Sequence, residues 1–327
     1  MALGDAVVMV DAEQTMRDRI YLAGFLVGSG LLLYASRSLL TKSALVTWGL
    51  TFAGTTAAAT LGLALYRVQL ELQASRHELA RKEAELNFAL EVQQALFPRQ
   101  FPVDGGLEFA AVCVPARGIS GDYYDVLPLT NGRLVFTVAD ISGKGISAAI
   151  LMSNLQAVLH TVAEAGHSAG EVCSQLNRHL YRVTGDNSWF ATCFYAEWDR
   201  AERTLHYVNA GHPWPIVRGS LRGQPLDQGG PPLGAFLTSQ FDVGKVLVQP
   251  GDLIVLYSDG ITEAATPQGE EFGESRLDAL IEACSTRPLV EIQQQVLKAV
   301  RDWAGQELAD DLTLLLVRAT GPLQEGT

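Results

Sequence analysis

Hydrophobic and polar positions divide the chain into an uncharged N-terminal part, a polar helical stretch and a long series of short apolar runs. After a polar segment over residues 1–19, residues 20–36 and 43–66 carry no charged side chain. A membrane-spanning helix needs about 20 apolar residues, so the second run is long enough and the first is marginal. Because only residues 37–42 join the runs, we expect a transmembrane helical hairpin over residues 20–66. A pair of buried helices in a soluble bundle is the alternative.

Basic residues near the hairpin indicate its orientation. Two arginines precede the hairpin, Arg17 and Arg19, and four basic residues follow it closely, Arg67, Arg76, Arg81 and Lys82. The connecting loop has only Arg37 and Lys42. Positive charge is enriched on the cytoplasmic side of membrane proteins. We therefore expect a multi-pass protein with both ends in the cytoplasm and with membrane lipid around the hairpin.

Residues 67–98 have the pattern of one polar linker helix. Leucines recur every seven residues, at Leu65, Leu72, Leu79 and Leu86. A heptad repeat of leucines is typical of a parallel coiled coil, which predicts a homodimer through residues 65–97. The companion heptad position is poor in apolar residues, so a single helix packed on its own domain stays open. Pro98 ends the helix.

From residue 99 to 320 the pattern predicts one domain of short strands and a few longer helices, followed by a tail over 321–327. The expected strands are 109–114, 124–129, 134–139, 191–198, 204–209, 215–217, 241–248, 253–258 and 313–318. The expected helices are 146–165, 169–183, 275–283 and 288–304. Because many strands follow one another through short turns, we expect antiparallel sheets with helices outside them.

Charge and cysteine content exclude two classes of function. The net charge of −12 argues against a nucleic-acid partner, since phosphate backbones attract basic surfaces. The four cysteines have no metal-binding spacing, so neither a zinc site nor a disulfide framework is expected. Reduced, mostly buried thiols remain.

Four acidic motifs stand at the ends of expected strands or in glycine turns. They are SGDYYD (120–125), ADISG (139–143), YSDG (257–260) and ADDLT (309–313). Each motif alone fits an ordinary turn, where aspartate and glycine are common. If carboxylates from the four motifs came together they would repel one another, and a hard divalent cation would neutralise them. The chain has no GxSxG motif, Walker loop or catalytic cysteine pattern that would compete with this interpretation.

Seven segments in order resemble the PPM-type metal-dependent protein serine/threonine phosphatases, in their bacterial SpoIIE/RsbU branch. They are QQALFP (93–98), ISGDYYDV (119–126), VADISGKGISAA (138–149), NAGHPWP (209–215), PPLGAF (231–236), GDLIVLYSDGITEA (251–264) and DDLTLLLV (310–317). The resemblance implies an α/β fold: an α-β-β-α sandwich of two antiparallel sheets flanked by helices.

The resemblance also implies a binding site for two divalent cations, Mn²⁺ or Mg²⁺. Asp122, Asp140, Asp259 and Asp310 would be the metal-binding carboxylates, helped by the backbone carbonyl of Ile141. Asp140 and Asp122 would be the central catalytic residues. Two such ions activate a water for direct attack on phosphorus, which agrees with the missing nucleophile motif.

Residues near these motifs are candidates for further roles. Arg117 could contact substrate phosphate, and His212 could act as a general acid or stabilise its turn. We expect Asp125 and Asp311 to be structural and Lys144 to be solvated. Ser120 stands where the family usually has a glycine before the first aspartate.

The sequence thus predicts a membrane-anchored phosphatase of the bacterial cytoplasmic membrane. By resemblance, its substrate would be a phosphorylated STAS-type anti-sigma-factor antagonist, and the linker helix would transmit a signal by rearranging near residues 92–98. A catalytically silent membrane scaffold that binds a phosphoprotein is the main alternative. A sensor that only dimerises and a phosphatase for small phosphoesters are the others.

Overall fold

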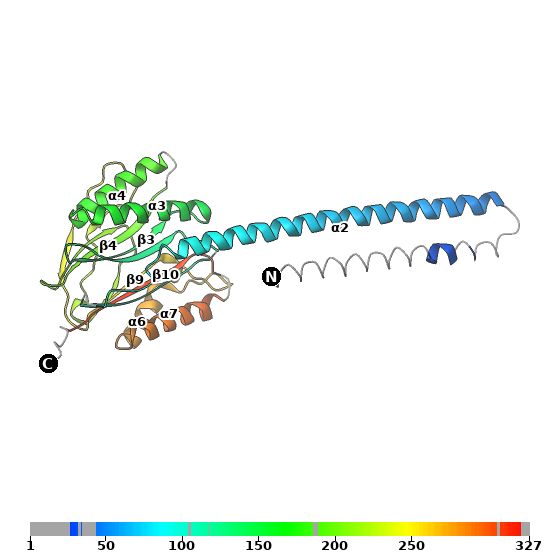
Figure 1. Cartoon of the computed structure of the whole chain (residues 1–327). Helices are drawn as coiled ribbons and strands as arrows, with labels where there is room; N and C mark the ends of the chain where they lie inside the picture. The colour runs from blue at the N-terminus through cyan, green and yellow to red at the C-terminus, as the bar shows by residue number, and fades with distance from the viewer. Residues whose placement is uncertain are drawn as a thin grey trace. The chain divides into compact units, whose positions relative to one another are not determined.

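The structure, a computed structural model, describes residues 27–31, 34, 44–103, 106–116, 118–185, 189–305 and 308–321. The chain divides into two compact units, Met1–Lys82 and Glu83–Thr327. The second unit contains all of the sheets, together with the last turns of the helix that crosses the division (Figure 1).

Helix α2 (Ala44–Gln94) is continuous over 51 residues, so the expected second membrane span and the linker helix form one element. By length and composition, its part from Trp48 to Gln94 could cross a membrane, and none of the apolar window is buried. Helix α3 (Ile146–Ala163) passes the same test, but it packs on a sheet. Of the first uncharged run, the structure describes only 27–31 and 34, which are helical.

Two sheets form the centre of the second unit. The first has the order β1 (Leu107–Val114), β10 (Leu312–Ala319), β9 (Leu253–Tyr257) and β6 (Ile216–Arg218). The second has the order β2 (Asp122–Pro128), β3 (Leu134–Ile141), β4 (Ala191–Asp199), β5 (Thr204–Ala210) and β7 (Gly229–Gly230), with β8 (Gly244–Leu247) also paired to β5. Among the described strands, all the pairings are antiparallel except β5 with β7, which corrects the expectation of purely antiparallel sheets.

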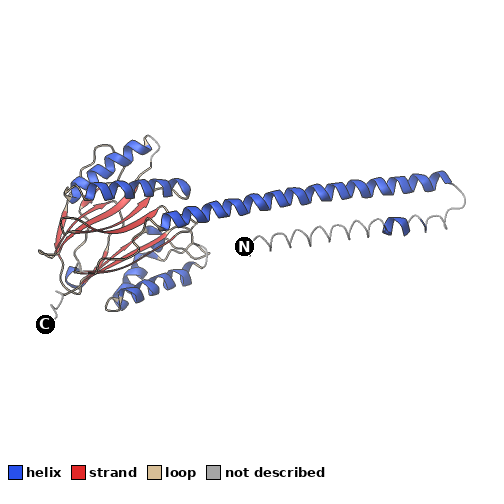
Figure 2. Cartoon of the chain, in the orientation of Figure 1, coloured by secondary structure: helices blue, strands red, loops and turns tan. Residues whose placement is uncertain are grey.

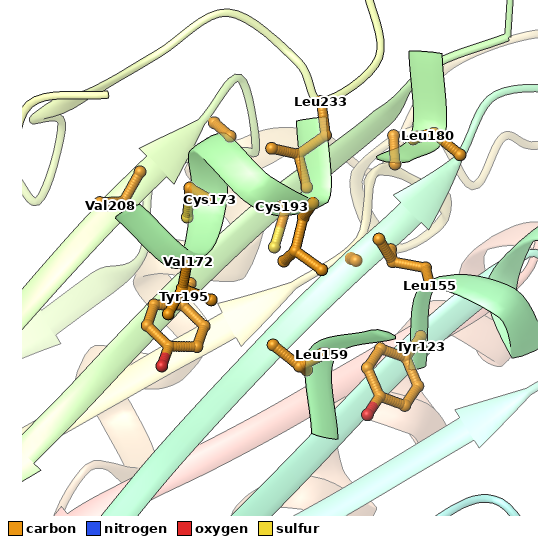
Figure 3. Packing of buried hydrophobic residues seen from close by; sticks show 14 of the residues in the cluster. Tyr123, Leu155, Leu159, Val172, Cys173, Leu180, Cys193, Tyr195, Val208 and Leu233 are labelled. Carbon is orange, nitrogen blue, oxygen red and sulfur yellow. The ribbon is translucent and has the colours of Figure 1, made fainter. Parts of the chain in front are cut away.

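Helices cover the outer face of each sheet, as the colours of Figure 2 show. Helices α3 and α4 (Ala169–Thr184) pack on the second sheet through residues such as Leu155, Leu159 and Val172 (Figure 3). Helices α6 (Gly273–Cys284) and α7 (Leu289–Ala304) pack on the first sheet. A third cluster fills the space between the sheets. The two-sheet, helix-flanked part of the sequence prediction is therefore confirmed.

The strand and helix predictions agree with the structure to within a few residues. Alternating or continuous apolar runs bury one or both faces of each strand, which explains why the pattern located them. Three short elements were not predicted: the 3₁₀ turn η1 (Gly219–Leu221), β7 and α5 (Asp259–Thr262). The four cysteines are free, as expected, and three of them are buried.

Candidate metal-dependent active site

Asp122 and Asp140 lie directly opposite each other on neighbouring strands. Asp122 begins β2, Asp140 stands near the end of β3, and the two are paired in the antiparallel register. Side chains of directly opposed residues lie on the same face of a sheet, about 5 Å apart at Cβ. The register therefore brings together two carboxylates that are 18 positions apart in the sequence.

Asp259 and Asp310 come from the other sheet. Asp259 is the first residue of α5, directly after β9, and Asp310 stands just before β10. Gly260 allows the close approach of these segments, because a Cβ there would lie 2.0 Å from the carbonyl oxygen of Asp311. Any side chain at this position would push the two loops apart.

The mutual charge of these carboxylates affects their protonation. Burial, together with the charges of Asp259 and Asp310, raises the pKa of Asp140 to about 7. Burial and the charge of Asp140 raise the pKa of Asp122 well above its usual range. Burial and the charge of Asp310 raise the pKa of Asp259. The four acidic side chains predicted to come together are thus close enough to repel one another.

The residues present fit a divalent cation. Oδ2 of Asp122 is buried and has no hydrogen-bond partner. Asp140 and Asp259 face an open hollow of about 520 Å³, and Ile141 ends β3 beside them. Within the described ranges, no three His, Cys, Asp or Glu side chains already surround a common point closely enough to hold an ion. A cation would relieve the repulsion between the carboxylates, and Oδ2 of Asp122 could coordinate it.

Lys144 is exposed, as expected from the sequence, but it also forms an ion pair at the rim of the site. It lies in the glycine turn between β3 and α3, with Nζ 2.5 Å from Oδ2 of Asp310. The ammonium also donates to the carbonyl of Ala309 at 3.0 Å. Opposite charge draws it across the rim of the site, although 44% of its side chain stays exposed.

A hydrogen-bond network around Ser120 fixes the start of β2. The Ser120 hydroxyl donates to Oδ2 of Asp311 at 2.9 Å and accepts from the backbone N–H of Asp122 at 3.0 Å. Asp311 also accepts from the backbone N–H groups of Ala116 and Gly121, each at 2.8 Å. Serine in place of the family's glycine therefore adds contacts, and the contacts of Asp311 are those of a structural carboxylate.

Gln93 joins the end of α2 to this network. Its amide donates from Nε2 to the carbonyl of Ser120 at 2.7 Å and accepts the N–H of Ser120 at 2.9 Å. Gln93 is only 4% exposed. Gln93 was not among the predicted site residues, although it stands with Gln94 at the start of the motif at residues 93–98.

Asp125 is also held by structural contacts. It accepts hydrogen bonds from the Tyr123 hydroxyl, from the N–H of Val126 at 2.8 Å and from Nε2 of His160 at 2.7 Å. His160 lies on α3, so the contact ties that helix to β2. The hydrogen bond with Asp125 raises the pKa of His160.

Arg117 and His212 were the two residues expected to contact substrate. Arg117 lies outside the described residues. His212 lines the hollow but is buried, and burial lowers its pKa to about 4, so it is neutral near pH 7. The ring Nδ1 of His212 lies 2.9 Å from Oγ1 of Thr192, and the backbone N–H of His212 donates to Oδ1 of Asn209 at 2.8 Å. These contacts favour the turn-stabilising interpretation.

Comparison with known sequences identifies relatives of this domain. Residues 130–320 match the model of the family Stage II sporulation protein E (SpoIIE). The phosphoserine phosphatase RsbU of Bacillus subtilis is 29% identical over 238 residues, which cover 72% of this chain and 70% of RsbU. The phosphoserine phosphatase RsbP of the same organism is 28% identical over 44% of this chain, but the match covers only 37% of RsbP. Asp140, Asp259 and Asp310 lie inside the family match, and Asp122 precedes it.

Solved structures share the fold. The RsbU and RsbW domains of Rv1364c from Mycobacterium tuberculosis align with a TM-score of 0.57 at 27% identity, over 66% of this chain and 60% of that one. The SiaA-PP2C domain of Pseudomonas aeruginosa aligns with a TM-score of 0.66 at 19% identity, over 73% of this chain and 98% of that one. The chain therefore belongs to the SpoIIE family, in the SpoIIE/RsbU branch of the PPM-type protein serine/threonine phosphatases.

Proposed function

We propose that the protein is a membrane-anchored phosphatase that hydrolyses phosphoserine or phosphothreonine with two divalent cations. The observation that carries the proposal is the grouping of four aspartates from both sheets. Asp140 is paired with Asp122 across the strands, and the charges of Asp259 and Asp310 raise its pKa. Carboxylates concentrated in this way can bind cations, and the bound cations can in turn bind a phosphate group.

The carboxylates of Asp122, Asp140, Asp259 and Asp310, with the carbonyl of Ile141, would hold the ions. Divalent cations bound there, Mn²⁺ or Mg²⁺, supply the positive charge that activates a water and neutralises the departing phosphate. The chain's own part is to hold the ligands rigidly. Asp122 and Asp140 sit on paired strands, and the close approach at Gly260 keeps Asp259 beside the loop of Asp310.

The substrate we propose is a phosphorylated STAS-type anti-sigma-factor antagonist. RsbU and RsbP are named phosphoserine phosphatases, which supports a substrate that carries phosphoserine. The hollow beside Asp140 is broad and open to solvent, so it can admit a phosphorylated side chain on a protein surface. Removal of the phosphate would tune a sigma factor.

The N-terminal part is proposed to anchor the phosphatase in the bacterial cytoplasmic membrane and to pair two copies. Its apolar window within Trp48–Gln94 is unburied. Leu65, Leu72 and Leu79 are each more than half exposed, at 58%, 51% and 57%. An exposed heptad row of leucines is covered when two such helices form a coiled coil. The phosphatase domain would lie in the cytoplasm.

We further propose that α2 regulates the site through Gln93. The helix ends at Gln94, and the amide of Gln93 holds the backbone of Ser120, two residues before Asp122. A change in the last turns of the helix would therefore shift Ser120, and with it Asp122 and Asp311. The hydrogen bonds of Gln93 could therefore transmit the expected rearrangement near residues 92–98 to the site.

Phosphate release from a phosphorylated STAS protein tests the proposed activity. The full chain in detergent should release phosphate when Mn²⁺ is present, and Asp140→Asn should abolish that release. Asp302→Asn removes an exposed carboxylate that pairs with Lys298 on α7, and it should keep full activity. Absence of turnover in the wild-type protein with Mn²⁺ or Mg²⁺ would contradict the proposal and favour the scaffold.

A further inference from the structure

A second hollow adjoins the one beside Asp140. The first has a volume of about 520 Å³ and the second about 420 Å³. Trp214 and Glu274 line both of them, so the two hollows adjoin, and we call them together the groove. The proposed chemistry uses the first hollow only. Because the second hollow adjoins the first, it could contact a part of the substrate away from the phosphate.

Trp214 stands at the junction of the two hollows with 60% of its surface exposed. Prolines at 213 and 215 flank it, and their rings restrict the backbone on either side. The backbone of this segment therefore loses little further conformational freedom when a partner binds. The large exposed surface of the indole suits contact with a partner side chain.

The groove is acidic. Glu263 and Glu274 line the first hollow, and Glu274 and Asp278 line the second. Burial and the charges of Glu274 and Asp278 raise the pKa of the Tyr257 hydroxyl, which places both carboxylates near that ring. Among the described lining residues, none is a lysine or an arginine.

Two arginines pair with carboxylates next to the second hollow. Arg218, whose side chain is only 11% exposed, pairs with Asp278 at 2.8 Å and with Glu282 at 2.6 Å. Arg222 also pairs with Glu282, at 3.0 Å, so the two arginines balance these two carboxylates. Glu274 therefore faces the groove beside Trp214 with no described cation lining the hollows to neutralise it.

We propose that the second hollow binds a basic side chain of the phosphoprotein substrate, an arginine or lysine near the phosphorylated residue. The cation would stack on Trp214 and form charge-assisted hydrogen bonds with Glu274. An extended chain advances about 3.4 Å per residue, so adjoining hollows of this size suit a basic residue within about three positions. The inference rests on the proposed function and adds the substrate feature that this site selects.

Phosphoserine peptides that differ at one position test the inference. A single arginine is moved through the three positions on each side of the phosphoserine, and glutamine at the same position is the neutral reference. Steady-state hydrolysis is measured with the full chain in detergent and Mn²⁺. At one position arginine should lower KM about tenfold relative to glutamine, with kcat little changed, and added salt should reduce the difference.

Variants locate the preference on the groove. Trp214→Ala and Glu274→Gln should each reduce the arginine-to-glutamine ratio of kcat/KM to less than one third of the wild-type ratio. Phe236→Ala removes another aromatic ring, 62% exposed, and Glu291→Gln removes another exposed carboxylate; both should keep the ratio. Equal kcat/KM for all peptides, or a preference that survives in both groove variants, would overturn the inference.

Binding separates failure of the inference from failure of the proposed function. If neither the peptides nor the phosphorylated STAS protein is hydrolysed, the proposed function fails, and calorimetric binding of the same peptides still tests the groove. Tighter binding of one arginine peptide by the wild-type chain, lost in Trp214→Ala, would support the basic-residue site alone. Equal binding of arginine and glutamine peptides would overturn it.

Discussion

Lys144 places a positive charge against one of the proposed metal ligands. Its ammonium pairs with Asp310 at 2.5 Å, and a divalent cation would have to compete with it for that carboxylate. We predict that Lys144→Met tightens Mn²⁺ binding, because the competing charge is removed. The pair is partly exposed, so we expect about a tenfold effect. Isothermal calorimetry on the full chain measures it.

A matched control for that experiment lies on α7. Lys298 pairs with Asp302 at the same distance, 2.5 Å, on an exposed helix surface. Lys298→Met should leave Mn²⁺ affinity unchanged. Equal or weaker binding by Lys144→Met would mean that the ammonium orients Asp310 for the ion instead of competing with it.

His160 makes part of the stability dependent on pH. Its hydrogen bond to the buried Asp125 raises its pKa above the ordinary value of about 6.5. The folded state therefore holds the proton more tightly than the unfolded state does. The resulting stability is fully present below about pH 6.5 and is lost as the pH rises through the raised pKa.

The prediction is that His160→Gln destabilises the chain more at pH 5.5 than at pH 8.5. Because 42% of the His160 side chain is exposed, the difference should be no more than about 1 kcal/mol. Urea unfolding of both proteins at the two pH values gives the comparison. A penalty for the variant that grows with pH would show that the sign of this linkage is wrong.

At the scale of elements, the contact between α2 and β2 depends on one buried amide. Gln93→Ala leaves the N–H and carbonyl of Ser120 without their partner in a buried position. We predict a loss of about 2–4 kcal/mol in unfolding free energy. We also predict a lower Mn²⁺-dependent turnover, because Ser120 supports Asp122 through its hydroxyl.

Gln94→Ala is the appropriate control for this substitution. Gln94 is the next residue of the same helix and is exposed. It should leave both stability and turnover within experimental error. If Gln93→Ala behaved like Gln94→Ala, the helix would not act on the site through this contact, and the proposed regulatory route would fail.

The sequence pattern predicted the strands well because a buried strand needs apolar residues at its buried positions. The strand β3 reads Leu134–Ile141 with seven of eight positions buried, and its apolar run ends at Asp140. By contrast, β7 is two glycines, which carry no side chain and so leave no pattern. The one parallel pairing was missed for the same reason.

Residues whose role depends on distant partners were the ones that sequence could not place. Gln93 bonds to a residue 27 positions away, and Lys144 bonds to residues more than 160 positions away. Neither contact follows from local periodicity or charge. The four aspartates stand in glycine turns or at strand ends, where local motifs make them candidates, and the family resemblance is what singles them out as predicted metal ligands.

For the whole molecule, pairing of two chains through α2 is the proposal that most affects regulation. We predict that Leu72→Asn with Leu79→Asn converts a dimer into a monomer, because both leucines lie on the exposed heptad row. Sedimentation of the full chain in detergent measures the mass. Leu70→Asn, also exposed but off that row, should remain dimeric. A wild-type monomer would exclude the coiled-coil dimer.

The number of Mn²⁺ ions bound per chain is the decisive measurement for the proposed metal site. The claim is that Asp122, Asp140, Asp259 and Asp310 together hold two divalent cations. Calorimetric titration of the full-length protein should give two ions per chain, and Asp140→Asn should bind fewer and more weakly. Asp302→Asn should match the wild type. No binding by the wild-type protein at millimolar Mn²⁺, or an Asp140→Asn variant that still binds two ions, would contradict the account.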